Sequence, residues 1–234
     1  MWGRSLYQNI QRFLLFQLTV NVTACLLVLC GAFMGTESPL TVTQMLWINL
    51  IMDTFAAMAL ASLPPSESVM RDKPRNRNAF ILDKAMMREI FGVGVFFFML
   101  LLAMLYVFQH ADIHQLTDLL HLHLGQKGHV SAYELTLLFT TFVTTHFFYL
   151  FNARAFKTGR SALHFKGCNG LLSIVATIAV GQVAMVEVPG LQQFFNVVGL
   201  KLTDWAIIIA GSSLVLWVRE AWHLVAGRKT KKNN

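Results

Sequence analysis

The chain has 234 residues, of which 55% are hydrophobic and only 13% are charged, and its mean hydropathy is +0.54. This composition excludes an ordinary soluble domain and indicates an integral membrane protein. The net charge of +7 does not indicate a nucleic-acid-binding protein, because the basic residues flank apolar runs and form no recognition module.

Six apolar runs are long enough to cross a bilayer as helices. We therefore predict an all-α, polytopic bundle of six transmembrane helices in three hairpins. A lead-in covers residues 1–12, the membrane domain residues 13–226 and a basic tail residues 227–234. The predicted spans are residues 13–34, 42–63, 90–109, 133–151, 168–188 and 203–225.

The connections between these runs differ in length and charge. Gly35–Thr43 is a short turn, and Pro64 and Pro65 end the second span. A basic, polar loop follows before the third span, whereas residues 191–202 are predicted to be a short connection. The first two spans therefore form an antiparallel hairpin.

The distribution of Lys and Arg predicts the orientation. Only Lys127 and Lys201, of 19 Lys and Arg residues, fall on the side opposite the two termini. Cytoplasmic loops of membrane proteins carry an excess of basic residues. Both termini are thus predicted to be cytoplasmic, in a multi-pass protein of the plasma membrane or an inner membrane.

The second span carries two polar residues, Asn49 and Asp53, in an otherwise apolar run. Residues four apart on an α-helix lie on one face, so their side-chain oxygens could converge on a cation. A carboxylate in mid-membrane costs several kcal/mol and usually faces a bundle interior or an ion pathway. The alternative is that Asn49 bonds a neighbouring helix and that Asp53 is solvated near the interface.

Five histidines lie in the loop between the third and fourth spans. They could bind zinc or copper, but the apolar residues between them, such as Ile113 and Leu116, equally fit an interfacial amphipathic segment. These histidines are His110, His114, His121, His123 and His129.

Four stretches carry a resemblance to a known family. They are FQLTVNVTA (16–24), PLTVTQMLWINLIMDTFAAMALASLPP (39–65), RDKPRNRNAFILDKAMMREI (71–90) and TTFVTTHFFYLFNAR (140–154). Together they resemble the C-terminal membrane region of P-type calcium ATPases, most closely the plasma-membrane type. The resemblance implies that the six spans correspond to the last six of the family's ten.

The resemblance also implies a calcium site. Asn49 and Asp53 would be the ligands from the family's sixth span, and Asn21 would be a further ligand or would orient one. Asn21 could equally hydrogen-bond across the hairpin. His146 stands where the family has Glu or Gln, but imidazole is a poor calcium ligand, so we expect a packed residue. Its alternative roles are a ligand or a titrating group.

The resemblance implies that one calcium ion is carried per cycle. Ala24 and Met52 stand where the two-site reticulum pumps carry a glutamate and a threonine, so a second site is not expected. Two oxygen ligands do not discriminate calcium from manganese.

No motif for ATP hydrolysis occurs in the chain. The DKTGT and TGE strings of P-type ATPases and the Walker A loop are all missing, so the chain alone should be inactive. ATP and Mg²⁺ would act through a missing N-terminal half, comprising four spans and the cytoplasmic domains, joined in cis or in trans. The alternatives are a non-catalytic membrane partner of a pump and an independent six-span cation channel or carrier.

Overall fold

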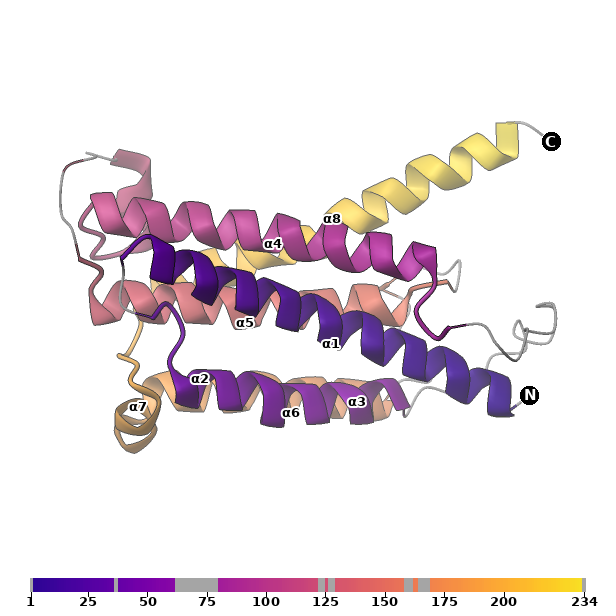
Figure 1. Ribbon diagram of the computed structural model, residues 1–234, viewed down its shortest axis with the longest axis horizontal. Coiled ribbons are helices and arrows are strands. Elements are labelled where there is room, and N and C mark those ends of the chain that lie inside the picture. The colour runs from indigo at the N-terminus through magenta and orange to yellow at the C-terminus, as the bar shows by residue number, and fades with distance from the viewer. Residues whose placement is uncertain are drawn as a thin grey trace.

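The fold is a bundle of long helices (Figure 1). The computed structural model describes residues 2–35, 38–61, 80–121, 125, 129–157, 162–163 and 169–232. Within these ranges there is no strand, and six helical segments are long and apolar enough to cross a membrane. The predicted all-α fold with six spans is therefore confirmed.

The observed helices extend several predicted spans. The spans are α1 (Trp2–Phe33), the composite of α2 (Val42–Leu46), η1 (Trp47–Met52) and α3 (Asp53–Ala61), α4 (Lys84–His110), α5 (Ala132–Arg154), α6 (Asn169–Glu187) and α8 (Leu202–Lys232). The lead-in is thus part of the first helix, and α4 begins at Lys84 rather than at residue 90. Pro64, Pro65, Lys127 and Cys168 lie outside the described residues.

The region predicted as a connection at residues 191–202 contains a helix instead. The short helix α7 (Pro189–Phe195) begins with a proline, which is well suited to a first helical turn because its fixed φ and missing N–H cost nothing there. Asn196 ends it in the left-handed conformation at φ 55°. The Pro189-Gly190 pair therefore starts a helix rather than only ending α6.

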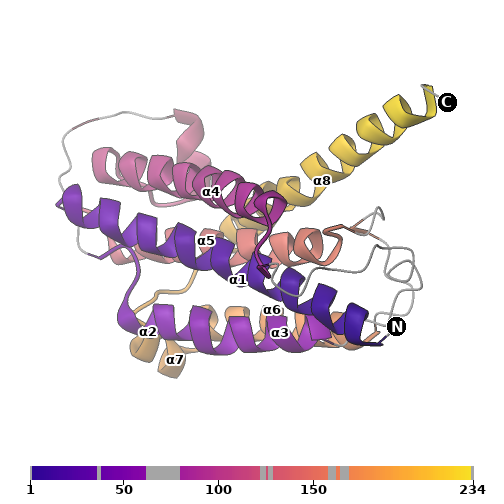
Figure 2. The same ribbon diagram turned by 45° about the vertical axis from the view of Figure 1, so that its right-hand side comes forward.

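The helices form three tiers in both views. In Figures 1 and 2, α4 lies above α1 and α5, while α2, α3 and α6 lie below them. The contact between α1 and α4 is close at Gly94, whose carbonyl accepts a hydrogen bond from the Thr23 hydroxyl at 3.2 Å. Both chain ends lie at the same end of the bundle in Figure 1.

Buried carboxylates fasten the loop at the far end of the bundle. Glu134 accepts hydrogen bonds from the Ile113 and Ser131 backbone N–H groups at 2.9 and 2.8 Å. Asp204, at the start of α8, accepts one from the Leu116 N–H at 2.7 Å. Ile113 and Leu116 are consequently buried in the core, so this part of the loop is not an interfacial amphipathic segment.

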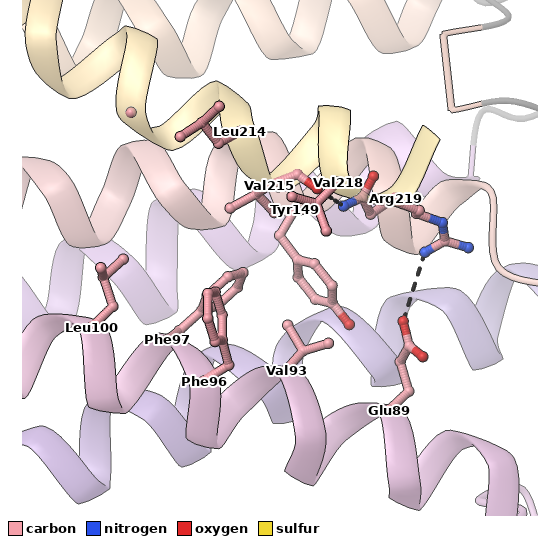
Figure 3. A pocket seen from close by; sticks show the side chains of 12 residues that line it. Glu89, Val93, Phe96, Phe97, Leu100, Tyr149, Leu214, Val215, Val218 and Arg219 are labelled. Carbon is pink, nitrogen blue, oxygen red and sulfur yellow. Dashed lines mark hydrogen bonds and ion pairs between the residues drawn. The ribbon is translucent and has the colours of Figure 1, made fainter. Parts of the chain in front are cut away.

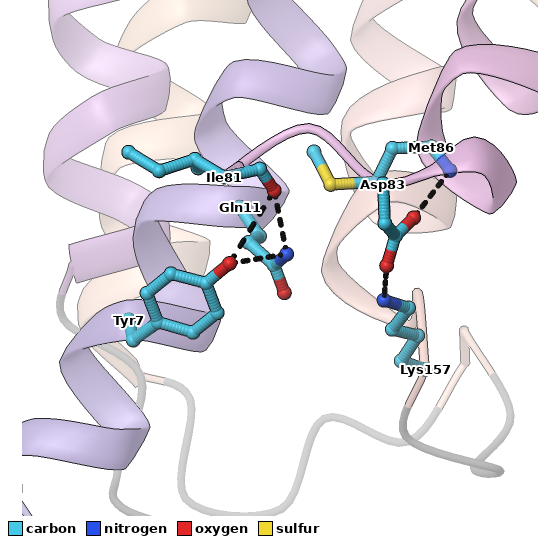
Figure 4. Close-up of polar contacts among 6 residues, drawn as sticks. All are labelled: Tyr7, Gln11, Ile81, Asp83, Met86 and Lys157. Atoms are coloured by element: carbon cyan, nitrogen blue, oxygen red, sulfur yellow. Dashed lines mark hydrogen bonds and ion pairs between the residues drawn. The ribbon is translucent and has the colours of Figure 1, made fainter. Parts of the chain in front are cut away.

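Polar contacts join three segments at the end that carries the termini (Figure 4). The Gln11 amide of α1 donates to the Ile81 carbonyl at 2.8 Å. Asp83 caps α4 by accepting the Met86 N–H at 2.8 Å, and it is paired with Lys157, just beyond α5. Partial burial alone would raise the pKa of Asp83, but these hydrogen bonds outweigh it and hold the pKa below its usual value.

Trp47 fixes the start of η1 against α6. A Cβ at Gly181 would lie 2.9 Å from its indole ring, and the Phe195 ring contacts the indole edge-on with centroids 5.8 Å apart. The indole is held between these two neighbours, so it has little room to move. Glycine at position 181 is therefore required for the packing of this span on α6.

We expect Gly181→Ala to lower the free energy of unfolding by about 1–3 kcal/mol, because the new methyl group overpacks Trp47. Gly92→Ala is the matched control, since Gly92 is also helical but has open space at its Cβ. It should stabilise the chain by up to about 1 kcal/mol through helix propensity. The measurement is thermal unfolding in detergent by circular dichroism. Equal effects of the two substitutions would contradict the packing.

We expect Asp83→Ala to destabilise the chain by about 1 kcal/mol, because α4 loses its cap, and Asp83→Asn to cost less, because the amide still accepts the Met86 N–H. Since the folded pKa is depressed, this stabilisation is present above about pH 4 and is lost as the pH falls through the folded pKa. The difference between wild type and Asp83→Ala should thus shrink on acidification in the same unfolding assay. Equal losses for Ala and Asn would refute the capping role.

Candidate functional site

Asp53 is a buried carboxylate in the middle of a span. Only 3% of its surface is exposed, and neither carboxylate oxygen has a hydrogen-bond partner among the described residues. The Gln17 side chain of α1 lies near this carboxylate, but it does not form a hydrogen bond of ordinary geometry with it. A buried charge without partners is costly, so this position requires a physical explanation.

The helix changes its winding directly before Asp53. Residues Trp47–Met52 form a π-helical turn, and the Asp53 N–H donates to the Ile48 carbonyl, five residues back. The Asn49 carbonyl therefore loses its ordinary α-helical donor, while the Thr54 hydroxyl donates to the Leu50 carbonyl. Such turns occur frequently at functional sites, because they redirect side chains and backbone carbonyls.

Asn49 and Asp53, which the sequence predicts to lie on one inward face, differ in burial. Asn49 is exposed, as is its neighbour Leu50, whereas Asp53 is buried. No described segment covers Asn49, whereas Asp53 faces α1.

Helix α1 supplies two amides on the side of Asp53. Gln17 and Asn21 are both half-buried, and because they are four residues apart in a regular α-helix they share a face. The sequence reading selected Asn21 alone. The spacing of Gln17 from Asn21 is the signal that could have identified both.

His146 lies in a different environment. Its side chain is fully buried, and its Nδ1 lies 2.7 Å from the Phe142 carbonyl of its own helix. The ring contacts Phe97 of α4 and Phe142, with centroids 5.1 and 4.3 Å apart, and Nε2 has no partner within the described structure. These contacts favour the interpretation of His146 as a packed residue.

The described part of the chain contains no cluster that could hold a metal by itself. No group of three or more His, Cys, Asp or Glu side chains comes together there. His123 lies outside the described residues, and the position of the His121 side chain is not described. Asp53 with the α1 amides can supply only part of a cation's coordination shell.

Comparisons with known proteins agree with one another. A family model described as cation transporting ATPase, C-terminus, matches residues 37–225. The chain is 35% identical over 218 residues to plasma membrane calcium-transporting ATPase 2 of Oreochromis mossambicus, covering 92% of the chain and 19% of the relative. It is 34% identical over 222 residues to human plasma membrane calcium-transporting ATPase 4, covering 93% and 17%. The chain thus spans about a fifth of the length of these relatives.

We expect His146→Phe to change the free energy of unfolding by less than about 1.5 kcal/mol, because phenylalanine fills a similar volume and leaves no unpaired ring nitrogen. His146→Ala, which leaves a cavity, should cost about 3 kcal/mol or more. Thermal unfolding of the two variants in detergent distinguishes them. Equal destabilisation by both would show that a ring nitrogen, rather than packing, matters at this position.

Proposed function

Since the chain belongs to the family of cation-transporting ATPase C-terminal membrane regions, we propose that it is the ion-pathway half of an ATP-driven calcium pump, carrying part of a single calcium site. The observation that carries this proposal is the buried Asp53 carboxylate without hydrogen-bond partners. A transported cation offsets the cost of such a charge during part of a cycle.

Asp53 is the central ligand in this proposal. Calcium takes six to eight oxygen ligands at about 2.3–2.6 Å, and carboxylate, amide and backbone carbonyl oxygens all suit it. Gln17 and Asn21 supply amide oxygens from α1, and η1 supplies backbone carbonyls beside Asp53. Backbone carbonyls of irregular helix turns also coordinate cations in other ion-transporting membrane proteins.

Asn49 becomes a ligand only in a larger assembly. It lies on an exposed face of η1 between the exposed residues Leu46 and Leu50. In the proposed pump this face packs against the spans of the N-terminal half, which contribute the remaining oxygens. That half also supplies ATP hydrolysis with its Mg²⁺, and it is joined in cis or in trans.

The burial of Ala24 and Met52 supports a single ion. Both side chains are apolar and no more than 1% exposed, so neither side chain offers an oxygen ligand. A second calcium ion beside Asp53 would then lack side-chain ligands from α1 and η1 at these two positions. We propose that one calcium ion is carried per cycle.

We expect ATP-driven calcium-45 uptake into inverted vesicles only when the chain is co-expressed with the first four spans and cytoplasmic domains of a calcium ATPase. Asp53→Asn should lower this uptake by at least tenfold, because the charged ligand is lost. Asp118→Asn is the matched control and should have no effect, because Asp118 lies in the helix η3 (Leu116–His121), away from Asp53, and accepts the His114 and Gln115 backbone N–H groups.

Two outcomes would overturn the proposal. Asp53-dependent calcium flux from the chain alone, without ATP, would make it a channel or carrier. Wild-type uptake by Asp53→Asn would remove Asp53 from the ion site and favour a regulatory partner. Immunoblotting of the same vesicles checks that all variants are present in equal amounts.

A further inference from the structure

A lateral groove opens between α4 and α8, with α5 as its floor (Figure 3). Its volume is about 580 Å³, within the range of about 300–1,000 Å³ typical of small-ligand sites. Phe96, Phe97 and Leu100 line it from α4, and Leu214 and Val218 from α8. The groove is thus almost entirely apolar along its length.

The groove has the length of one bilayer leaflet. Glu89 and Leu100 mark its extent along α4, and at 1.5 Å per residue they lie about 16 Å apart. Half of a hydrocarbon core of about 30 Å is about 15 Å. A partner helix that crosses the membrane would need a groove as long as the whole hydrocarbon core. An acyl chain needs a groove only as long as one leaflet.

Both charges of the groove lie at one end of it. Glu89 and Arg219 approach to 3.7 Å, and both side chains are about one third exposed. This is the end of the bundle at which α4 begins and α5 ends. A long, partly exposed ion pair of this kind is weak, so both charges can bind other groups.

Asn152 provides a further polar atom in the groove. It is 4% exposed and donates to the Val215 carbonyl at 3.0 Å, but its Oδ1 has no hydrogen-bond partner within the described residues. This oxygen can accept a hydrogen bond from a ligand. The groove end therefore presents two acceptors, Glu89 and Asn152, and one cation, Arg219.

We propose that the groove binds one amine-bearing glycerophospholipid of the adjacent leaflet, such as phosphatidylethanolamine. Its phosphate pairs with Arg219, its ammonium donates to Glu89 and to Asn152 Oδ1, and one acyl chain lies along Phe97, Leu100 and Leu214. A purely anionic lipid would be repelled by Glu89. A sterol would leave both charges without partners.

Native mass spectrometry of the purified chain, released from micelles with dioleoyl phosphatidylethanolamine or dioleoyl phosphatidylglycerol, tests the proposal. We expect one retained phosphatidylethanolamine and weaker retention of phosphatidylglycerol. Gly211→Leu should weaken retention at least tenfold, because Gly211 lines the groove and has open space at its Cβ. Arg219→Gln should weaken it about fivefold, the equivalent of roughly 1 kcal/mol.

Two controls match these changes. Gly92→Leu adds the same side chain to an exposed α4 position outside the groove, and Arg88→Gln removes one positive charge next to Glu89. Neither should alter retention. Equal retention by Gly211→Leu, equal binding of both lipids, or a co-purifying single-span protein in place of lipid would each overturn the proposal. Circular dichroism of each variant confirms that it is folded.

Discussion

The Asp53 carboxylate is the group on which the interpretation of this bundle depends. Several other polar side chains of the spans have local partners: the Thr19 hydroxyl donates to the Leu15 carbonyl, and the Thr145 and Ser212 hydroxyls bond each other. The buried carboxylates Glu134 and Asp204 each accept backbone N–H groups. Asp53 alone among the buried acidic residues described has two unsatisfied oxygens. Its cost of several kcal/mol persists unless a cation or proton offsets it.

The surroundings of Asp53 are held from two sides. Trp47 anchors the beginning of the π turn to α6 and α7, and the end of the turn presents Asp53 to Gln17 of α1. A displacement of α1 relative to α6 therefore changes the environment of the carboxylate directly. The long, continuous α1 begins at Trp2, so a force applied at that end reaches Gln17 without an intervening loop.

Much of the architecture could be predicted from the sequence, because apolar length and basic flanks report directly on membrane spans. The family and the position of Asp53 in a span also followed from sequence motifs. The π turn could not be predicted, because hydrophobic periodicity assumes regular helices. The exposure of Asn49 was missed because a sequence does not show which face of a helix its neighbours cover. The helix α7 was missed because Pro-Gly both ends and begins helices. The position of Gln17 beside Asp53 depends on the packing of α1 against α3, which the sequence does not show.

Two surfaces of the bundle lack a partner among the described residues, and the chemistry of the two surfaces differs. The exposed face of η1 places the Asn49 amide in a span, and an amide in contact with lipid tails would be left without hydrogen bonds. That face therefore suits polypeptide, as the proposed pump requires. The α4/α8 groove is apolar for one leaflet and charged only at its mouth, which suits a lipid. Because α5 and α1 lie between the groove and α3, the proposed lipid would lie outside the proposed ion pathway and would act on it only through these helices.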